Sequence, residues 1–107
     1  MRDVAVVGVG MTEFGRFPQK SMFDLAREAV LDALADGQVH IKDIETLYAG
    51  SQYNVFVPGQ YFLREVGMTQ IPVVNVVNAC ATGSTAVREA YMAVASGMHD
   101  IVVVGGA

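Results

Sequence analysis

The sequence predicts an α/β fold in which a parallel sheet carries helices on both faces. Short runs rich in valine and isoleucine alternate with longer segments whose apolar residues recur at helical spacing. The strand-like runs do not alternate apolar with polar residues, which is typical of strands covered on both faces, as in parallel sheets. Strand and helix alternate three times before a last strand, and this order predicts a βαβαβαβ unit with right-handed crossovers.

The first predicted strand is Asp3–Gly10, a continuous run rich in valine. Residues 11–20 contain a glycine and a proline and are predicted to form a loop. Ser21 then suits a helix N-cap, Asp24 three residues later completes a capping box, and Gly37 supplies a left-handed stop. Between them, the apolar residues at helical spacing are Met22, Leu25, Ala26, Ala29, Val30, Ala33 and Leu34.

The middle of the chain predicts two further strands and a short helix. Thr46–Gly50 is the second predicted strand. Pro58 suits the first turn of a helix, and Gln60–Val66 can form two turns before Gly67 ends them. Pro72–Val77 is the third predicted strand, with its proline at the first position, where a missing N–H is tolerated.

The last part of the chain predicts a buried helix and a fourth strand. Ser84–Ser96 forms the helix, which Gly97 ends, and its only charged residues are Arg88 and Glu89. A helix that is apolar nearly all round is expected to be central and buried. Ile101–Val104 is the fourth predicted strand, and no helix follows to cover it. The chain is therefore expected to be part of a larger unit.

Composition excludes several classes of function. A length of 107 residues fits one domain, and 52% of them are hydrophobic. Seven basic residues against eleven acidic ones, without a basic cluster, argue against nucleic acid as a partner. The single cysteine excludes an intramolecular disulfide and fits a reducing compartment, so a cytoplasmic location is expected. No secretory signal is visible, and no apolar stretch approaches the ~20 residues of a bilayer span, so no membrane partner is expected.

Two weaker patterns are interpreted as structural. Gly8 and Gly10 follow the first predicted strand, but a dinucleotide-binding fingerprint needs a third glycine where Glu13 stands, and a helix that starts at once. We interpret the pair as a turn at the end of the strand. His40 and His99 lie next to turns, at no spacing that would pair them as metal ligands. We interpret both as partly exposed polar residues and expect no metal site.

Cys80 has the most informative chemical context in the sequence. It falls after the predicted strand Pro72–Val77 and before the predicted helix Ser84–Ser96, at the sheet edge where α/β proteins form their sites. A helix N-terminus stabilises a negatively charged thiolate, and the small residues 81–84 leave room for a substrate. Position alone leaves two interpretations open, a reactive nucleophile or a small buried hydrophobe. The apolar helix behind Cys80 favours a rigidly held nucleophile.

The segment Val74–Ser84 resembles the nucleophile motif of the thiolase superfamily, above all that of the sterol-carrier-protein-type and archaeal thiolases. The opening Val6–Gly15 is similar to the start of the same branch. Asp43–Gly50 and Ile101–Gly106 are similar to its second and fourth strands. Ketoacyl synthases and hydroxymethylglutaryl-CoA synthases share the fold but generally lack the Asn-x-Cys-x-Thr-Gly-Ser pattern found here. Residues 1–107 are thus identified as part of a thiolase-like N-terminal domain.

The resemblance implies an acyl-CoA acyltransferase in which Cys80 is the catalytic nucleophile. The cysteine would take the acyl group from a coenzyme A thioester and pass it on by Claisen condensation or thiolysis. Its backbone N–H would help to bind the oxyanion. Coenzyme A enters as substrate, so no cofactor is implied. Family members also carry a second α/β half, which supplies the activating histidine, so the 107 residues alone are expected to be inactive.

The resemblance also implies partners, and other functions remain as alternatives. Thiolases associate as dimers, so a homo-oligomer or the missing remainder of the thiolase is the expected partner. The main alternative is a non-catalytic remnant or assembly module, in which Cys80 only packs and apolar surface serves association. The alkylation rate of Cys80 separates these two hypotheses, because a poised thiolate reacts fast and a packed thiol does not. A nucleotide-binding protein is a distant third hypothesis, which a thermal shift with NAD or ATP would test.

Overall fold

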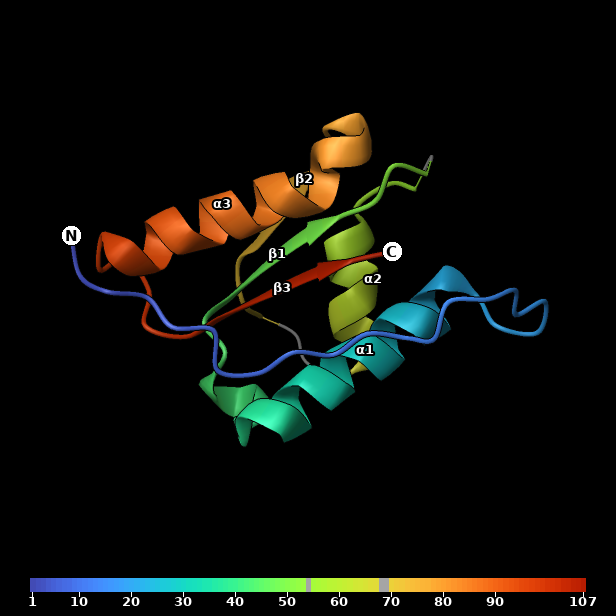
Figure 1. Ribbon diagram of the computed structural model, residues 1–107, viewed down its shortest axis with the longest axis horizontal. Coiled ribbons are helices and arrows are strands. Elements are labelled where there is room, and N and C mark those ends of the chain that lie inside the picture. Colours follow the sequence, from blue (N-terminus) through green and yellow to red (C-terminus); the bar gives the residue numbers. More distant parts are fainter. Residues whose placement is uncertain (54, 68–69) are drawn as a thin grey trace.

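In the computed structural model, the chain forms an α/β unit in which helices cover both faces of a parallel sheet (Figure 1). The structure describes residues 1–53, 55–67 and 70–107. This architecture confirms the predicted fold class. Among the described residues, no helix is both long enough and apolar enough to cross a membrane.

The sheet has three parallel strands among the described residues, in the order β2-β1-β3. These are β1 (Thr46–Gly50), β2 (Val73–Val76) and β3 (Val102–Gly106). The chain moves in one direction from β1 to β2 and then back across β1 to reach β3. Crossovers of the same hand therefore place the two connecting helices on opposite faces of the sheet.

Both faces of β1 are buried because its side chains alternate between two cores. The helices are α1 (Met22–Gly37), α2 (Pro58–Glu65) and α3 (Thr82–Ala95). Leu47 and Ala49 pack in one core with residues of α1 and α2, including Phe62. Tyr48 points to the other face and packs against the alanines of α3, which are Ala86, Ala90 and Ala93. This double burial confirms the interpretation of the unalternated strand sequence.

Most predicted elements are present, with bounds within about two residues of those expected. Gly67 and Gly97 have positive φ angles of 77° and 83° and follow α2 and α3, where the sequence predicts glycine stops. The described residues also form two short 3₁₀ helices, η1 (Ile41–Asp43) and η2 (Ala79–Ala81). The sequence between β1 and α2, residues 52–57, is expected to form a loop, and residue 54 lies outside the described residues.

The N-terminus of α1 confirms the predicted capping box. The Asp24 N–H donates to the Ser21 hydroxyl at 3.1 Å, and the Ser21 N–H donates to the Asp24 carboxylate at 2.9 Å. The predicted C-terminal stop is wrong, because the left-handed residue is Gln38, with φ 53°. Gly37 instead allows a close approach, since a Cβ there would lie 3.2 Å from the Val7 carbonyl oxygen.

The predicted first strand, Asp3–Gly10, is wrong. Among the described residues the segment pairs with no strand, and it runs across α1 (Figure 1). Its glycines explain this path, because a Cβ on Gly8 or Gly10 would clash with the carbonyl oxygens of Ala33 or Ala29. The segment therefore packs on α1 through its bare backbone instead of pairing with the sheet. These glycines also do not form the predicted turn, and they lie away from the N-terminus of α1, where a pyrophosphate would bind.

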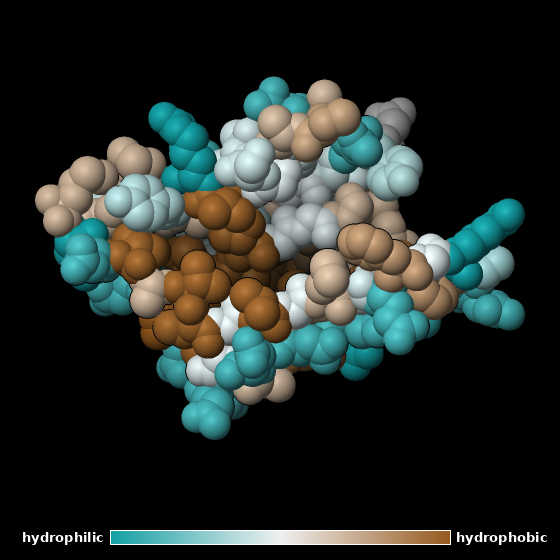
Figure 2. Space-filling view, viewed as in Figure 1, coloured by the Kyte–Doolittle hydropathy of each residue, from teal (hydrophilic) through white to brown (hydrophobic). Residues whose placement is uncertain are grey.

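This N-terminal segment presents three of its four valines to solvent. Val6, Val7 and Val9 are 82%, 63% and 68% exposed. Figure 2 shows hydrophobic residues gathered on the face of the molecule that this segment crosses. A contiguous apolar surface is typical of regions that another part of a protein or a partner covers.

The prediction that α3 is buried on all sides is also wrong. Its alanines line the face against the sheet, whereas Val87 and Tyr91 on the outer side are 55% and 48% exposed. The sequence shows an apolar helix, but only three strands are present to cover it among the described residues. The outer face of α3 is thus a second exposed apolar surface.

Candidate active site

Cys80 lies at the carboxyl edge of the sheet, between β2 and α3. It is the middle residue of η2, which leads directly into α3. Cys80 is exposed in this chain. The structure therefore places the cysteine between a strand end and a helix start, as the sequence predicts.

The turn that carries Cys80 has an unusual backbone conformation. Ala79 has a φ of 48°, in the left-handed region that costs a residue with a Cβ roughly 1–2 kcal/mol. The Thr82 side chain is buried, and its hydroxyl accepts from the Asn78 N–H at 2.9 Å and donates to the Ala79 carbonyl at 2.7 Å. The Asn78 side chain donates to the Thr85 hydroxyl at 3.0 Å. These bonds hold the turn against the cost of the left-handed residue.

No side chain caps the N-terminus of α3 in the described structure. The hydroxyls of Ser84 and Thr85 donate to the Ala81 carbonyl at 3.1 Å and 2.7 Å, and the Thr85 hydroxyl accepts from the Asn78 side chain. A Cβ added to Gly83 would meet no other atom within 4 Å, so the space beside the first turn is open. The Thr82 N–H donates to the Ala79 carbonyl in the preceding turn. The positive end of the helix dipole still favours negative charge near the start of α3.

The carboxyl end of β1 packs directly against this turn. A Cβ on Gly50 would clash with the methyl group of Thr82 and would lie 3.0 Å from the Val76 carbonyl oxygen. Gly50 therefore has no room for a side chain. Because no Cβ is present at this position, the end of β1 packs directly against the turn. Ser51, the next residue, is buried and accepts from the Tyr53 N–H at 3.1 Å.

Asn75 in β2 caps the neighbouring helix, a role that the sequence pattern did not reveal. Its side-chain oxygen accepts from the Gly59 N–H at 2.8 Å, and its amide donates to the Gln60 side chain at 2.9 Å. The residue before α2 is Val57, which has no side chain able to cap the helix. Because Val57 cannot cap α2 and Pro58 has no N–H, the first amides of the helix need an acceptor from another part of the chain.

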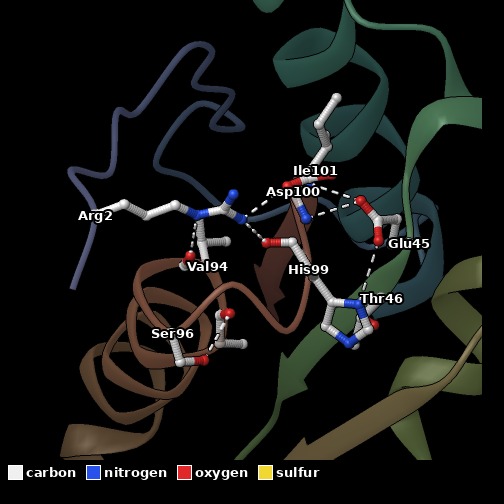
Figure 3. Close-up of polar contacts among 9 residues, drawn as sticks. Arg2, Glu45, Thr46, Val94, Ser96, His99, Asp100 and Ile101 are labelled. Atoms are coloured by element: carbon white, nitrogen blue, oxygen red, sulfur yellow. Dashed lines mark hydrogen bonds and ion pairs between the residues drawn. The ribbon is translucent and has the colours of Figure 1, made fainter.

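A second polar cluster lies at the opposite, amino edge of the sheet (Figure 3). The His99 ring is 2.8 Å from the Thr46 hydroxyl through Nε2 and 3.4 Å from the Glu45 carboxylate through Nδ1. The other Glu45 oxygen accepts from the backbone N–H groups of Asp100 and Ile101 at 2.8 Å and 3.1 Å. The cluster ties the start of β1 to the start of β3. His99 is partly exposed, as predicted, but it is well supplied with partners that the sequence did not indicate.

Neither histidine lies beside Cys80. His99 belongs to the amino-edge cluster, and His40 accepts from the Lys42 N–H at 3.1 Å at the start of η1. Within the described ranges, no group of three or more His, Cys, Asp or Glu residues could hold a metal ion. The candidate site therefore consists of Cys80, its turn and the start of α3.

The amino-edge cluster predicts how stability depends on pH. The backbone N–H groups of Asp100 and Ile101 hold the pKa of Glu45 below its usual value of 4.5. Because the folded pKa lies below the unfolded one, this stabilisation is fully present above about pH 4.5 and is lost as pH falls through the folded value. Glu45→Gln cannot ionise, so its melting temperature is expected to change less than that of the wild type between about pH 5 and about pH 3.

Thermal melts followed by circular dichroism check this expectation. Asp43→Asn is a suitable control, because it removes an exposed carboxylate two residues away. Equal slopes for wild type and Glu45→Gln below about pH 5 would show that the Glu45 bonds do not contribute.

Comparison with known proteins identifies the family. Residues 4–107 match the thiolase N-terminal domain. The chain belongs to this family. Its predicted resemblance to thiolases is therefore confirmed.

Several thiolase-family relatives are similar over nearly the whole chain. An acetyl-CoA acetyltransferase from Methanothermobacter thermautotrophicus is 40% identical, and the match covers 99% of this chain and 29% of the relative. Human sterol carrier protein 2 is 39% identical, with 99% of this chain and 20% of the relative covered. The solved Ltp2-ChsH2(DUF35) aldolase has a TM-score of 0.78 at 30% identity and covers 94% of this chain and 26% of that one. The thiolase-family chain thus spans less than a third of each relative.

Proposed function

We propose that this thiolase-family chain carries the acyl-accepting nucleophile of an acyl-CoA acyltransferase, and that Cys80 is that nucleophile. The observation that carries the proposal is the exposed thiol in the turn before the uncapped N-terminus of α3. The similarity to archaeal acetyl-CoA acetyltransferases supports a coenzyme A thioester as the acyl donor.

The proposed reaction passes through a covalent acyl-enzyme. The Cys80 thiolate attacks the carbonyl carbon of the thioester, and the resulting oxyanion collapses to release coenzyme A as a thiolate. The acyl group then lies on Cys80 as a new thioester. Attack by the carbanion of a second acyl-CoA on this thioester forms the new carbon–carbon bond of a Claisen condensation and releases the Cys80 thiolate. Thiolysis is the reverse: Cys80 attacks the 3-keto carbonyl of a 3-ketoacyl-CoA, the carbanion of the shorter acyl-CoA leaves and is protonated, and coenzyme A then takes the acyl group from Cys80. Amides at the start of α3 would favour the negative charge that develops in each step.

The proposal places the activating base outside this chain. His40 and His99 belong to other parts of the fold, as described above. We propose that the base lies in the part of the full-length relatives that this chain does not span. The exposed apolar surfaces of the N-terminal segment and of α3 support the same idea, because the remainder of a thiolase or a second copy would cover them.

A chimera tests the proposal directly. The chain would replace the matching segment of the Methanothermobacter acetyl-CoA acetyltransferase, and intact mass spectrometry would follow incubation with acetyl-CoA. We expect the chimera to gain one acetyl group and peptide mapping to place it on Cys80, whereas the isolated chain should gain none. The unaltered relative, treated in parallel, shows that the conditions permit acylation. A folded chimera acylated elsewhere, or not at all, would favour the non-catalytic assembly module.

A further inference from the structure

We propose that Thr82 is a positioning residue for Cys80, because its buried hydroxyl holds the turn before the cysteine in the left-handed conformation. This inference rests on the proposed function of Cys80 as nucleophile. In this inference Thr82 acts on the position of Cys80 and does not itself contact the substrate.

The hydroxyl of Thr82 closes a ring around the left-handed residue. It accepts from the Asn78 N–H at 2.9 Å and donates to the Ala79 carbonyl at 2.7 Å. The two backbone groups lie on either side of the φ and ψ bonds of Ala79, whose φ is 48°. Rotation of Ala79 into the ordinary right-handed or extended region would move the Asn78 N–H away from the Thr82 hydroxyl, so the two bonds can be made together only near the observed conformation. The threonine therefore stabilises this conformation specifically.

The methyl group of Thr82 supports the same arrangement from the other side. It occupies the place that a side chain on Gly50 would take, so the end of β1 packs against it. A β-branched side chain has few χ1 rotamers, and this contact favours one of them. Thr82 is only 7% exposed, so water competes little for its hydroxyl. The contact with β1 thus holds the Thr82 side chain in one rotamer, and in this rotamer its hydroxyl bonds to the turn before Cys80.

The hydroxyls of Ser84 and Thr85 donate to a carbonyl that follows the cysteine. Ser84 and Thr85 both donate to the Ala81 carbonyl, and neither bonds to Ala79. Among these three side chains, Thr82 alone bonds to the backbone of the residues that precede Cys80, whereas Thr85 accepts from the Asn78 side chain. Its loss is expected to let Ala79 relax and Cys80 move from its place at the start of α3, while the sheet and helices remain.

Three variants of the 107-residue chain separate positioning from general destabilisation. Thr82→Val keeps the shape and removes the hydroxyl, and Thr82→Ser keeps the hydroxyl. Thr46→Val is the matched control, because it removes the hydroxyl of another buried threonine at the opposite edge of the sheet. Circular dichroism establishes that each variant is folded. Cys80 is the single cysteine, so iodoacetamide uptake reports on it alone.

We expect Thr82→Val to slow alkylation of Cys80 about tenfold, the factor in rate that one lost hydrogen bond of ordinary strength supplies. Thr82→Ser should stay within about threefold of the wild type, and Thr46→Val within about twofold. A strong intraresidue NOE between the N–H and Hα of Ala79 marks its positive φ. It should be lost in Thr82→Val and kept in the other two variants.

The proposal is overturned if Thr82→Val keeps the wild-type rate or the Ala79 NOE, or if Thr46→Val slows alkylation as much. Failure of the proposed function has a different signature. In that case the chimera would not be acylated on Cys80, even though Thr82→Val changes the Ala79 signal and the alkylation rate.

Discussion

Cys80→Ala is expected to abolish formation of the acyl-enzyme on this chain. Cys80 is its only cysteine, so no other thiol of these 107 residues can form a thioester. In the chimera with the archaeal acetyltransferase, condensation or thiolysis should fall by about a thousandfold or more, as expected when a covalent nucleophile is removed. Cys80→Ser should show a similar loss, because an alcohol is far less ionised than a thiol at neutral pH.

Two measurements check the Cys80 variants. Mass spectrometry detects the acyl-enzyme, and release of free coenzyme A gives the rate. Ser96→Ala is the control, because that hydroxyl follows the last turn of α3 and donates to the Ala93 carbonyl at 3.1 Å, far along the helix from the cysteine. If Cys80→Ala kept the rate of the parent chimera, another group would have to be the nucleophile.

The largest effect on stability is expected for Phe62→Ala. Phe62 is 1% exposed and joins α2 to the core that includes Leu47 and Ala49 of β1. Removing a fully buried phenylalanine lowers the free energy of unfolding by about 3–5 kcal/mol, since transfer and cavity terms add. Domains of this kind are stable by about 5–15 kcal/mol, so much of the folding free energy would be lost.

Urea denaturation measures this loss, with Tyr61→Ala as the matched control. Tyr61 is the preceding residue of α2, and its ring lies 5.0 Å from that of Phe23, but it is 36% exposed. Its replacement should cost clearly less than that of Phe62. Equal losses for the two variants would mean that α2 does not bury Phe62 in solution.

The sequence predicted those features that depend on neighbouring residues. The Ser21–Asp24 capping box, the strand Thr46–Gly50 and the placement of Cys80 between a strand and a helix are all present. Each is encoded within a few residues by side-chain periodicity, a cap or a turn signal. The motif around Cys80 likewise indicated the thiolase family, to which the chain belongs.

Only the tertiary structure decided the features that depend on distant parts of the chain. Asp3–Gly10 has the composition of a strand, yet its glycines pack on α1, a contact that strand propensity does not include. The acceptors for Gly59 and the partners of Glu45 come from residues far along the sequence. Thr82 and Gly50 meet because parallel strands bring their carboxyl ends to one edge of the sheet. Local patterns encode which element forms, whereas the packing of elements selects the partner of each polar group.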